Sequence, residues 1–346
     1  MELITGNAAV RAAARNFERY SSDLQGDQDV RDYKQLPLEV DPPEHAAIRQ
    51  LIAPWFLKDS LAEHAGEFRS LIAELIAEAK DLGRVEVIQQ LALPMVVRCL
   101  GVVFGRPQDV EEWFSWGPDT WITDEDGIRH GDHLDRYLKK TFDELDANPT
   151  EDIFGVVNRA ELDGRPLTRL EKYGIANLVL AGGRDTVVKL VCGSLSYLAQ
   201  NGKLRETLRA DNSQIPEFIL EMVRFLSPLP MMHRVDKERT TDPTNPHYVW
   251  LSFVSANHDE SVLECPAEIR LDRGVGAQLG FGYGRHSCIG LHLAQLQTKI
   301  LLEQWLSSFT SWKVESDSVI HHELEGFPHV PSRFESLSLS LETFAS

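Results

Sequence analysis

Apolar residues three and four positions apart dominate this 346-residue sequence and limit the folds that it can adopt. The pattern recurs in four runs with charged residues between the apolar ones: Leu61–Lys80, Leu134–Leu145, Thr168–Gln200 and Gln214–Leu226. This spacing gathers the apolar side chains on one face of a helix. Strand-like patterns are confined to Tyr248–Val254 and Ser336–Leu341. We therefore expect a mainly α fold with small β-sheets (α+β).

The third helical run has a marked start. It opens with Thr168-Arg-Leu-Glu171, in which the hydroxyl and the carboxylate can each accept a hydrogen bond from a free backbone N–H of the first turn. This capping box predicts a helix that begins after Thr168. No internal repeat and no linker divides the chain, so we expect one large domain over residues 1–346.

Charge and hydropathy exclude several classes of partner. A formal net charge of −18 repels the phosphate backbone, so we expect no nucleic-acid partner. The longest apolar stretches, Leu91–Phe104 and Ile175–Gly183, fall short of the ~18 residues that cross a bilayer. Residues 1–6 lack the basic and apolar regions of a secretory signal. These features predict a cytosolic protein without membrane insertion.

The segment Phe281–Gly290, with the sequence Phe-Gly-Tyr-Gly-Arg-His-Ser-Cys-Ile-Gly, carries the most chemical information. Three glycines around Cys288 imply a tightly turned backbone that lies close to a flat or bulky group. A helical pattern starts at Leu291, and the free N–H groups at a helix start favour a thiolate over a thiol. A thiolate is a metal ligand, and on haem iron it favours O–O cleavage.

Other interpretations of this cysteine remain open at this point. His286 and Cys288 could form half of a zinc site, although no second Cys/His pair stands at ligand spacing. A free cysteine is also commonly buried and inert. The remaining cysteines, Cys99, Cys192 and Cys265, are far apart and predict no disulfide framework.

Ala181-Gly-Gly-Arg-Asp-Thr186 lies in the middle of the third helical run. Each glycine inside a helix costs roughly 1 kcal/mol relative to alanine. Close helix packing is one explanation for both glycines. The other is a local bulge at an active site, where a side-chain hydroxyl takes over a backbone hydrogen bond.

Two further patterns pair charged groups on helices. Glu221 and Arg224 are three residues apart and share a face, which by itself is a common surface arrangement. The Asp41-Pro-Pro turn is typical of a helix start, and it places His45 and Arg49 one turn apart on the same side. Both cations could be ordinary solvated charges.

The segment Phe281–Gly290 resembles the haem-binding loop of the cytochrome P450 family, Phe-Gly-x-Gly-x-His-x-Cys-x-Gly, and every fixed position is matched. The other three motifs follow in the order and spacing of that family, so the resemblance covers nearly the whole chain. The stretch Gly182–Val187 is most similar to the bacterial camphor-hydroxylase type. The resemblance implies the P450 fold, in a domain that lacks the usual N-terminal helix and first strand.

The same resemblance implies a haem-thiolate monooxygenase. Its cofactor would be haem b (iron protoporphyrin IX), and it would insert one oxygen atom from O2 into a small apolar substrate. Cys288 would be the axial metal ligand, and Asp185 and Thr186 would form the acid–alcohol pair that delivers protons. Glu221 and Arg224 would form a buried structural pair. The other cofactor-binding positions that it implies are His45, Arg49, Gly182, Arg234, Phe281, His286 and Gly290.

The positions that match substrate contacts in the family are mostly apolar: Tyr33, Leu178, Ala181, Pro230 and Val330. For any one of them, an ordinary core position is an equally good interpretation. The sequence contains no flavin or iron–sulfur motif, so electrons are expected from a ferredoxin-type partner and its NAD(P)H-dependent reductase.

Two alternatives to this function remain. One is a peroxide-driven variant, a group that replaces the acid–alcohol pair present here. The other is a haem-binding protein without monooxygenase activity that serves as a sensor or partner subunit.

A short N-terminus would also deprive Ser21–Val40 of packing partners, so we expect Gln25–Tyr33 to be mobile or rearranged and the haem pocket to be open to water.

Overall fold

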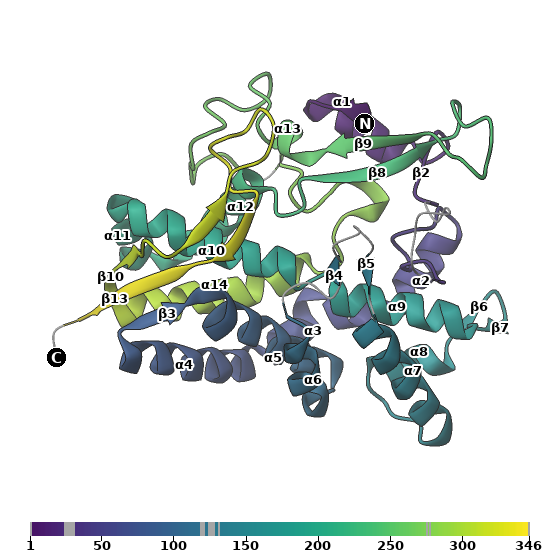
Figure 1. Cartoon of the computed structure of the whole chain (residues 1–346), viewed down its shortest axis with the longest axis horizontal. Coiled ribbons are helices and arrows are strands. Elements are labelled where there is room, and N and C mark those ends of the chain that lie inside the picture. The colour runs from purple at the N-terminus through teal and green to yellow at the C-terminus, as the bar shows by residue number, and fades with distance from the viewer. Residues whose placement is uncertain are drawn as a thin grey trace.

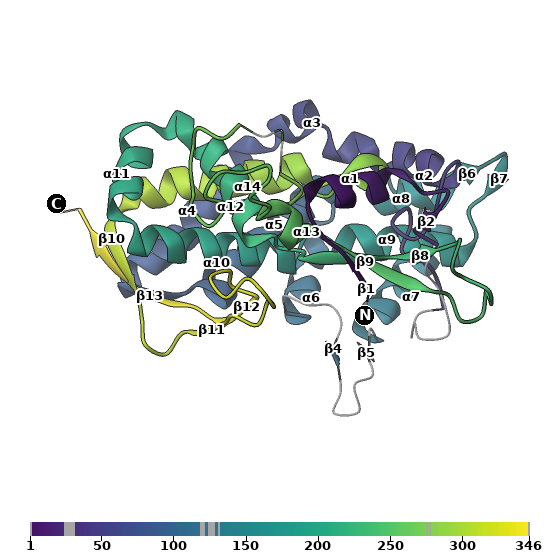
Figure 2. The ribbon, with the colours of Figure 1, turned by 90° about the horizontal axis from the view of Figure 1, so that it is seen from above.

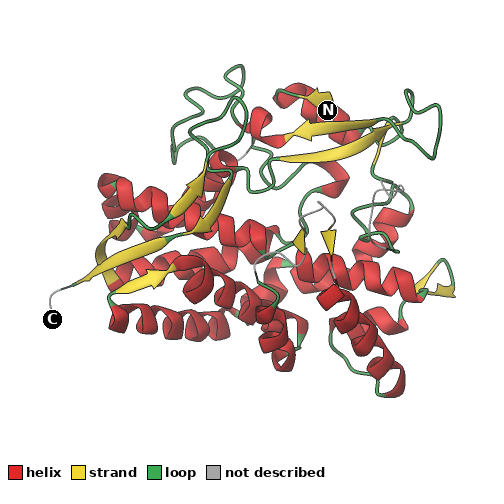
Figure 3. Ribbon diagram, viewed as in Figure 1, coloured by secondary structure: helices red, strands yellow, loops and turns green. Residues whose placement is uncertain are grey.

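The computed structural model describes residues 2–23, 32–117, 122–123, 129–130, 132–274, 276 and 278–344. Helices form the body of the molecule, and strands lie along its borders (Figure 3). This arrangement confirms the predicted mainly α fold with small sheets. Within the described residues, no helix combines the length and the apolar character that crossing a membrane requires.

The longer helices are α1 (Asn7–Arg15), α2 (Glu44–Ile52), α4 (Ala65–Leu82), α5 (Leu93–Phe104), α7 (Asp132–Ala147), α9 (Arg169–Ala181), α10 (Asp185–Gln200), α11 (Gly202–Ala210), α12 (Ile215–Leu226) and α14 (Leu291–Ser308). The shorter ones are α3 (Lys58–Glu63), α6 (Val110–Ser115), α8 (Ile153–Arg159) and α13 (Phe253–Asn257), with the single turns η1 (Ala53–Phe56), η2 (Ile88–Ala92), η3 (Pro107–Asp109), η4 (Asn212–Gln214) and η5 (Gly284–His286). Helix α14 packs against α4 and α12, and α10 packs against α12 (Figures 1 and 2).

The strands form small sheets. The largest has the order β1-β9-β8-β2, with β1 (Glu2–Ile4), β9 (Tyr248–Ser252), β8 (Met231–Asp236) and β2 (Tyr20–Ser21). A second sheet joins β10 (Phe309–Val314), β13 (Ser338–Thr343) and β3 (Arg84–Glu86). The pairs are β11 (Val319–His321) with β12 (Arg333–Ser336), β4 (Ile122–Thr123) with β5 (Arg129–His130), and β6 (Glu161–Leu162) with β7 (Arg165–Pro166).

The predicted helical run Thr168–Gln200 is two helices rather than one continuous helix. Its start is confirmed, because Thr168 and Glu171 form the complete capping box. The helix then stops at Ala181, and α10 begins at Asp185 after the turn Gly182–Arg184. The glycine pair thus allows a full interruption, which is larger than the bulge that the sequence predicted.

The two strand-like patterns are confirmed as β9 and β13, but the expectation that strands are confined to them is wrong. Strand β8 has buried residues only in its second half, so it shows no alternation of apolar and polar residues. Strand β10 follows α14 directly, without a turn residue that would mark the boundary. Both strands are specified by tertiary pairing more than by local pattern.

The described part of Ser21–Val40 is well packed, which corrects the expectation that it lacks packing partners. Ser21, Ser22, Leu36 and Val40 are buried, and the Asp41 carboxylate accepts hydrogen bonds from the Ser21 hydroxyl (2.6 Å) and the Ser22 N–H (2.9 Å). Of the segment Gln25–Tyr33, residues 25–31 lie outside the described residues.

Candidate functional site

The loop around Cys288 is held in shape by its backbone. Gly282 and Gly284 adopt φ values of 72° and 74°, which side-chain-bearing residues rarely adopt. The Cys288 N–H donates to the carbonyl of Phe281 (2.8 Å), and this bond closes the loop. Helix α14 begins three residues after Cys288, as the sequence predicted.

The Cys288 side chain is accessible although the loop surrounds it. It belongs to the exposed cysteines, whereas Cys99 and Cys192 are buried. Desolvation raises the pKa of the Cys288 thiol, and this effect is opposed by the Gly290 N–H that is directed at the sulfur and by the charge of Arg49. The sulfur is therefore presented as a ligand atom beside a cation.

Basic side chains from three distant segments gather at this cysteine. His45 and Arg49 come from α2, Arg234 comes from β8, and His286 comes from η5. The His45 and His286 rings lie 4.3 Å apart between centroids, and the Ser22 hydroxyl lies 3.0 Å from His286 Nε2. The structure thus brings together the four basic side chains that the sequence singled out.

These basic side chains have few acidic partners, and burial keeps the two histidines neutral near pH 7. Burial, together with the charge of Arg234, lowers the pKa of His286 to about 3, and burial lowers that of Arg234 to about 10. Within the part of the chain that the structure describes, Asp41 is the one carboxylate with a marked effect on their pKa values. Its oxygens already accept from Ser21, Ser22 and Lys237. Nε2 of the buried His45 has no hydrogen-bond partner among the described residues.

The interruption between α9 and α10 forms a second part of the site. A Cβ atom on Gly182 would lie 2.9 Å from the Leu178 carbonyl, whereas one on Gly183 would meet nothing within 4 Å. Gly182 and Asp185 are exposed although these helices run through the middle of the molecule (Figures 1 and 2). Gly183 therefore borders open space, and Gly182 allows close approach to the carbonyl of its own preceding turn; within the described part of the chain, neither glycine packs against another helix.

Asp185 and Thr186 form the first turn of α10. The Thr186 hydroxyl lies 3.4 Å from the Gly182 carbonyl, so it can take over a backbone group that the interruption frees. One turn further on, the Lys189 ammonium is buried without a hydrogen-bond partner in the described part of the chain. Desolvation lowers its pKa to about 8, and the charge of Asp185 opposes this shift.

The pair Glu221 and Arg224 is buried on α12, as predicted. The Arg224 guanidinium donates to both carboxylate oxygens of Glu221 at 2.8 and 2.9 Å. It also donates to the carbonyls of Asn257, Pro266 and Glu268. The pair thus joins α12 to α13 and to the chain that leads to the Cys288 loop.

The residues proposed to contact substrate have mixed surroundings. Leu178, Ala181 and Pro230 are half-buried, which suits the wall of a pocket, whereas Val330 is fully buried. Tyr33 is buried as well, and its hydroxyl donates to Asp135 (2.5 Å) and accepts from the Asn177 amide (3.0 Å). The Tyr33 hydroxyl is therefore already engaged within the protein.

Sequence reasoning missed two side chains at the site. Ser22 contacts His286, and nothing in its local pattern marks it. Arg184 is fully buried inside the glycine interruption and donates to the Trp113 carbonyl (2.8 Å). A charged residue inside an apolar helical run was the available signal for Arg184.

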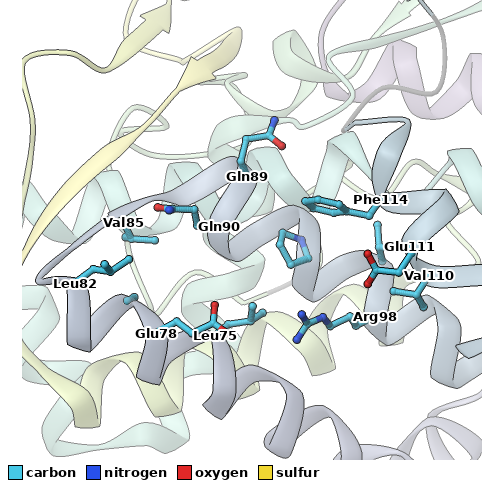
Figure 4. A pocket seen from close by; sticks show the side chains of 13 residues that line it. Leu75, Glu78, Leu82, Val85, Gln89, Gln90, Arg98, Val110, Glu111 and Phe114 are labelled. Atoms are coloured by element: carbon cyan, nitrogen blue, oxygen red, sulfur yellow. The ribbon is translucent and has the colours of Figure 1, made fainter.

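One cavity lies apart from these residues. It measures about 260 Å³ and is lined by α4, η2, α5 and α6. Figure 4 shows apolar side chains such as Leu75 and Phe114 beside the polar groups of Gln90, Arg98 and Glu111. None of the predicted site residues lines it.

Comparison with known proteins decides the family. The family model described as Cytochrome P450 matches residues 271–335, which include the Cys288 loop. A solved structure titled "The structure of a carbohydrate active P450" superposes with a TM-score of 0.87 at 31% identity and covers 98% of this chain and 92% of that chain. The chain belongs to the cytochrome P450 family.

Curated P450 relatives agree with this assignment. The cyclomarin C epoxidase of Salinispora arenicola is 29% identical over 83% of this chain and 76% of its own length. The steroid C26-monooxygenase of Mycolicibacterium smegmatis is 27% identical over 90% of this chain and 81% of its own length. This P450 is accordingly a monooxygenase, an oxidoreductase that depends on haem b, a substrate and redox partners.

The residues present fit haem b. The cofactor carries two carboxylates, and the charges of Arg49 and Arg234 have little acidic compensation. The neutral imidazoles of His45 and His286 can add N–H donors. Arginine and histidine suit carboxylates because they bind them through charge-assisted hydrogen bonds. Cys288 is accessible, and the charge of Arg49 acts on its sulfur. The donor set thus matches an iron ligand beside a dianion.

Proposed function

We propose that this P450 hydroxylates a small apolar substrate, with Cys288 as iron ligand and His45, Arg49, Arg234 and His286 around the propionates. The observation that carries the proposal is the cluster of two poorly compensated arginines and two buried histidines beside an accessible cysteine. Haem supplies the activation of O2 when it is bound. One oxygen atom enters the substrate and the other leaves as water, with two electrons and two protons consumed.

The protein's part in this reaction is proton delivery. We assign it to Asp185 and Thr186, because both lie at the interruption where the helix is open to solvent. The exposed Asp185 carboxylate exchanges protons with water, and the Thr186 Oγ1 passes them on beside Gly182. The presence of this pair speaks against the peroxide-driven variant.

Thr186→Ala is expected to bind haem and substrate normally but to waste electrons. Without Oγ1, the proton path loses its last group. A positioned proton donor typically contributes roughly 10²–10⁴-fold to the rate of the step that it serves. Product per NADH should fall and peroxide per NADH should rise in a reconstituted system. Val187→Ala, one residue further on, is the matched control. An unchanged ratio of product to NADH in Thr186→Ala would remove this assignment.

The substrate pocket is proposed to be apolar. Leu178, Ala181 and Pro230 offer partly accessible apolar surface, and the relatives' names point to cyclomarin C, a steroid and carbohydrate as test classes. Spin-shift titrations with camphor, testosterone, cyclomarin C and a methyl glycoside separate these classes. We expect the largest shift with camphor and a weaker one after Leu178→Phe. A shift with the glycoside alone would contradict an apolar pocket.

The electron donor is proposed to be an acidic ferredoxin that docks beside the Cys288 loop, with an NAD(P)H-dependent reductase behind it. Helix α1 packs against η5 there, and Arg11 and Arg15 stack on the Tyr283 ring at 4.3 and 4.6 Å. Arg285 lies over Phe17 at 5.1 Å. On a protein of net charge −18, this local excess of arginine is suited to steer an acidic partner.

Charge reversal at this surface tests the docking proposal. In Arg11→Glu/Arg15→Glu, ferredoxin-driven reduction should slow by about tenfold or more at low salt, and the difference should shrink as salt rises. Lys139→Glu on α7, which lies away from α1 in both views, should keep the normal rate (Figures 1 and 2). Equal slowing in both variants would place the partner elsewhere. Such a donor is a soluble protein, and this supports a cytoplasmic location.

A further inference from the structure

Arg184 occupies an unusual position for an arginine. It stands between Gly183 and Asp185, in the interruption of the helix, and its side chain is completely buried. Arginine is rarely buried to this extent unless its donors are engaged. Its neighbours in sequence are Gly183 of the interruption and Asp185, which is assigned above to proton delivery, so the partners of Arg184 bear directly on the proton path.

The partners lie at the end of another helix. The Arg184 guanidinium donates to the carbonyl of Trp113 at 2.8 Å and to that of Gly117; Trp113 lies in the last turn of α6 and Gly117 follows its C-cap residue Trp116. The last carbonyls of a helix carry partial negative charge and lack partners within the helix. Arg184 thus closes the end of α6, and its Cζ also lies 5.8 Å from the Trp116 ring centroid.

The end of α6 is itself firmly embedded. Trp113 is fully buried, and it contacts Phe104 of α5 and Tyr137 of α7 edge-on at 6.3 and 6.0 Å. Trp116 contacts Tyr137 as well, at 5.3 Å. A shift of this aromatic cluster therefore cannot occur without moving the two carbonyls that hold Arg184.

We propose that Arg184 is a positioning residue that couples the end of α6 to the interruption between α9 and α10, so that the seating of α6 sets the geometry of Asp185 and Thr186. The inference rests on the proposed role of these two residues in proton delivery. Arg184 touches neither cofactor nor substrate in this scheme. It acts through the backbone of Gly183 and Asp185, and it links a wall of the helical body to the proton path.

A measurement on the unaltered, haem-loaded protein comes first. The amides of Trp116, Gly117 and Arg184 form hydrogen bonds to Trp113, Phe114 and Ala181, so their exchange reports both ends of the link. The probe is 4-phenylimidazole. If Arg184 couples the two segments, the probe should slow hydrogen exchange in residues 110–117 and 182–188 by the same factor. Protection of one segment without the other would overturn the proposal.

Variants then separate coupling from simple anchoring. Arg184→Met removes the donors, and Arg184→Lys keeps the charge but loses the planar fork. Arg209→Met is the matched control, because Arg209 likewise donates to carbonyls at a helix end, those of Leu306, Phe309 and Thr310 at the end of α14 rather than α6. Both Arg184 variants should weaken 4-phenylimidazole binding, and the Arg209 variant should not.

Peroxide per NADH distinguishes them. It should rise roughly threefold or more in Arg184→Met, rise less in Arg184→Lys and stay normal in Arg209→Met, in line with coupling carried by packed side chains. Equal peroxide in Arg184→Met and the unaltered protein would refute the coupling. If Thr186→Ala also left peroxide per NADH unchanged, the proposed proton path itself would be wrong. The Thr186 variant therefore separates a failure of the proton path from a failure of the coupling through Arg184.

Discussion

Cys288→Ser is expected to abolish the strongly red-shifted Soret band that reduced, carbon-monoxide-bound protein shows with a thiolate ligand. A serine hydroxyl ionises far less readily than a thiol and cannot supply the same electron density to the iron. The sulfur is held by the Cys288–Phe281 backbone bond and by the start of α14, and serine changes neither. The fold should therefore remain, and the effect should be confined to the ligand.

The matched control for this change is Cys265→Ser, since Cys265 is the other exposed cysteine among the four. Its variant should keep the band at full intensity. Reduced-minus-oxidised difference spectra with carbon monoxide, normalised to haem content, provide the measurement. A persistent band in Cys288→Ser would mean that another residue holds the iron, and a band lost in both variants would point to a general effect of cysteine removal.

The residues that sequence could assign to the site are those whose neighbours constrain the backbone. Cys288 stands in a loop with two positive-φ glycines ahead of a helix, and both features are visible as Gly-x-Gly and as a new periodic run. The capping box at Thr168 is equally local, and the structure contains it unchanged. Local hydrogen-bond chemistry was thus sufficient for these positions.

Other features depend on contacts that no local pattern records. Strand β8 carries Arg234 to the cluster of basic side chains around Cys288. It is placed by its antiparallel pairing with β9, the next strand in the chain, because β8 itself shows no alternation of apolar and polar residues. Ser22 reaches His286 across 264 positions of sequence. Arg184 finds its carbonyl partners on α6, far earlier in the chain. Tertiary pairing decides each of these, so spacing alone could not predict them.

The complete interruption between α9 and α10 shows how two levels combine. Glycine's low helix propensity indicates a weak point, but it does not say whether the helix bends, bulges or stops. Arg184 helps to decide the outcome, because its side chain is drawn toward the end of α6. The local sequence sets the position of the interruption, and tertiary contacts set its form.

Glu221→Ala is expected to destabilise the fold by roughly 3–5 kcal/mol, the cost of leaving a buried charge without its partner. Glu221 accepts from Arg224 and also from Arg273 at 3.2 Å, and all three side chains are nearly inaccessible. Its removal therefore leaves two buried guanidinium groups facing each other. Arg224 would lose its orientation toward the carbonyls of Asn257, Pro266 and Glu268. The segment that leads to the Cys288 loop would then lose these hydrogen bonds.

Chemical denaturation and haem content together measure this effect. Asp143→Ala serves as the control, since Asp143 and Lys139 form an exposed pair four residues apart on a helix, and such pairs contribute only about 0.3–0.5 kcal/mol. Glu221→Gln keeps two hydrogen-bond sites without the charge and should fall between the two. Because the network borders the cysteine loop, Glu221→Ala should also lose haem at a denaturant concentration at which Asp143→Ala retains it. Normal stability and full haem content in Glu221→Ala would show that the buried network contributes neither to the fold nor to cofactor retention.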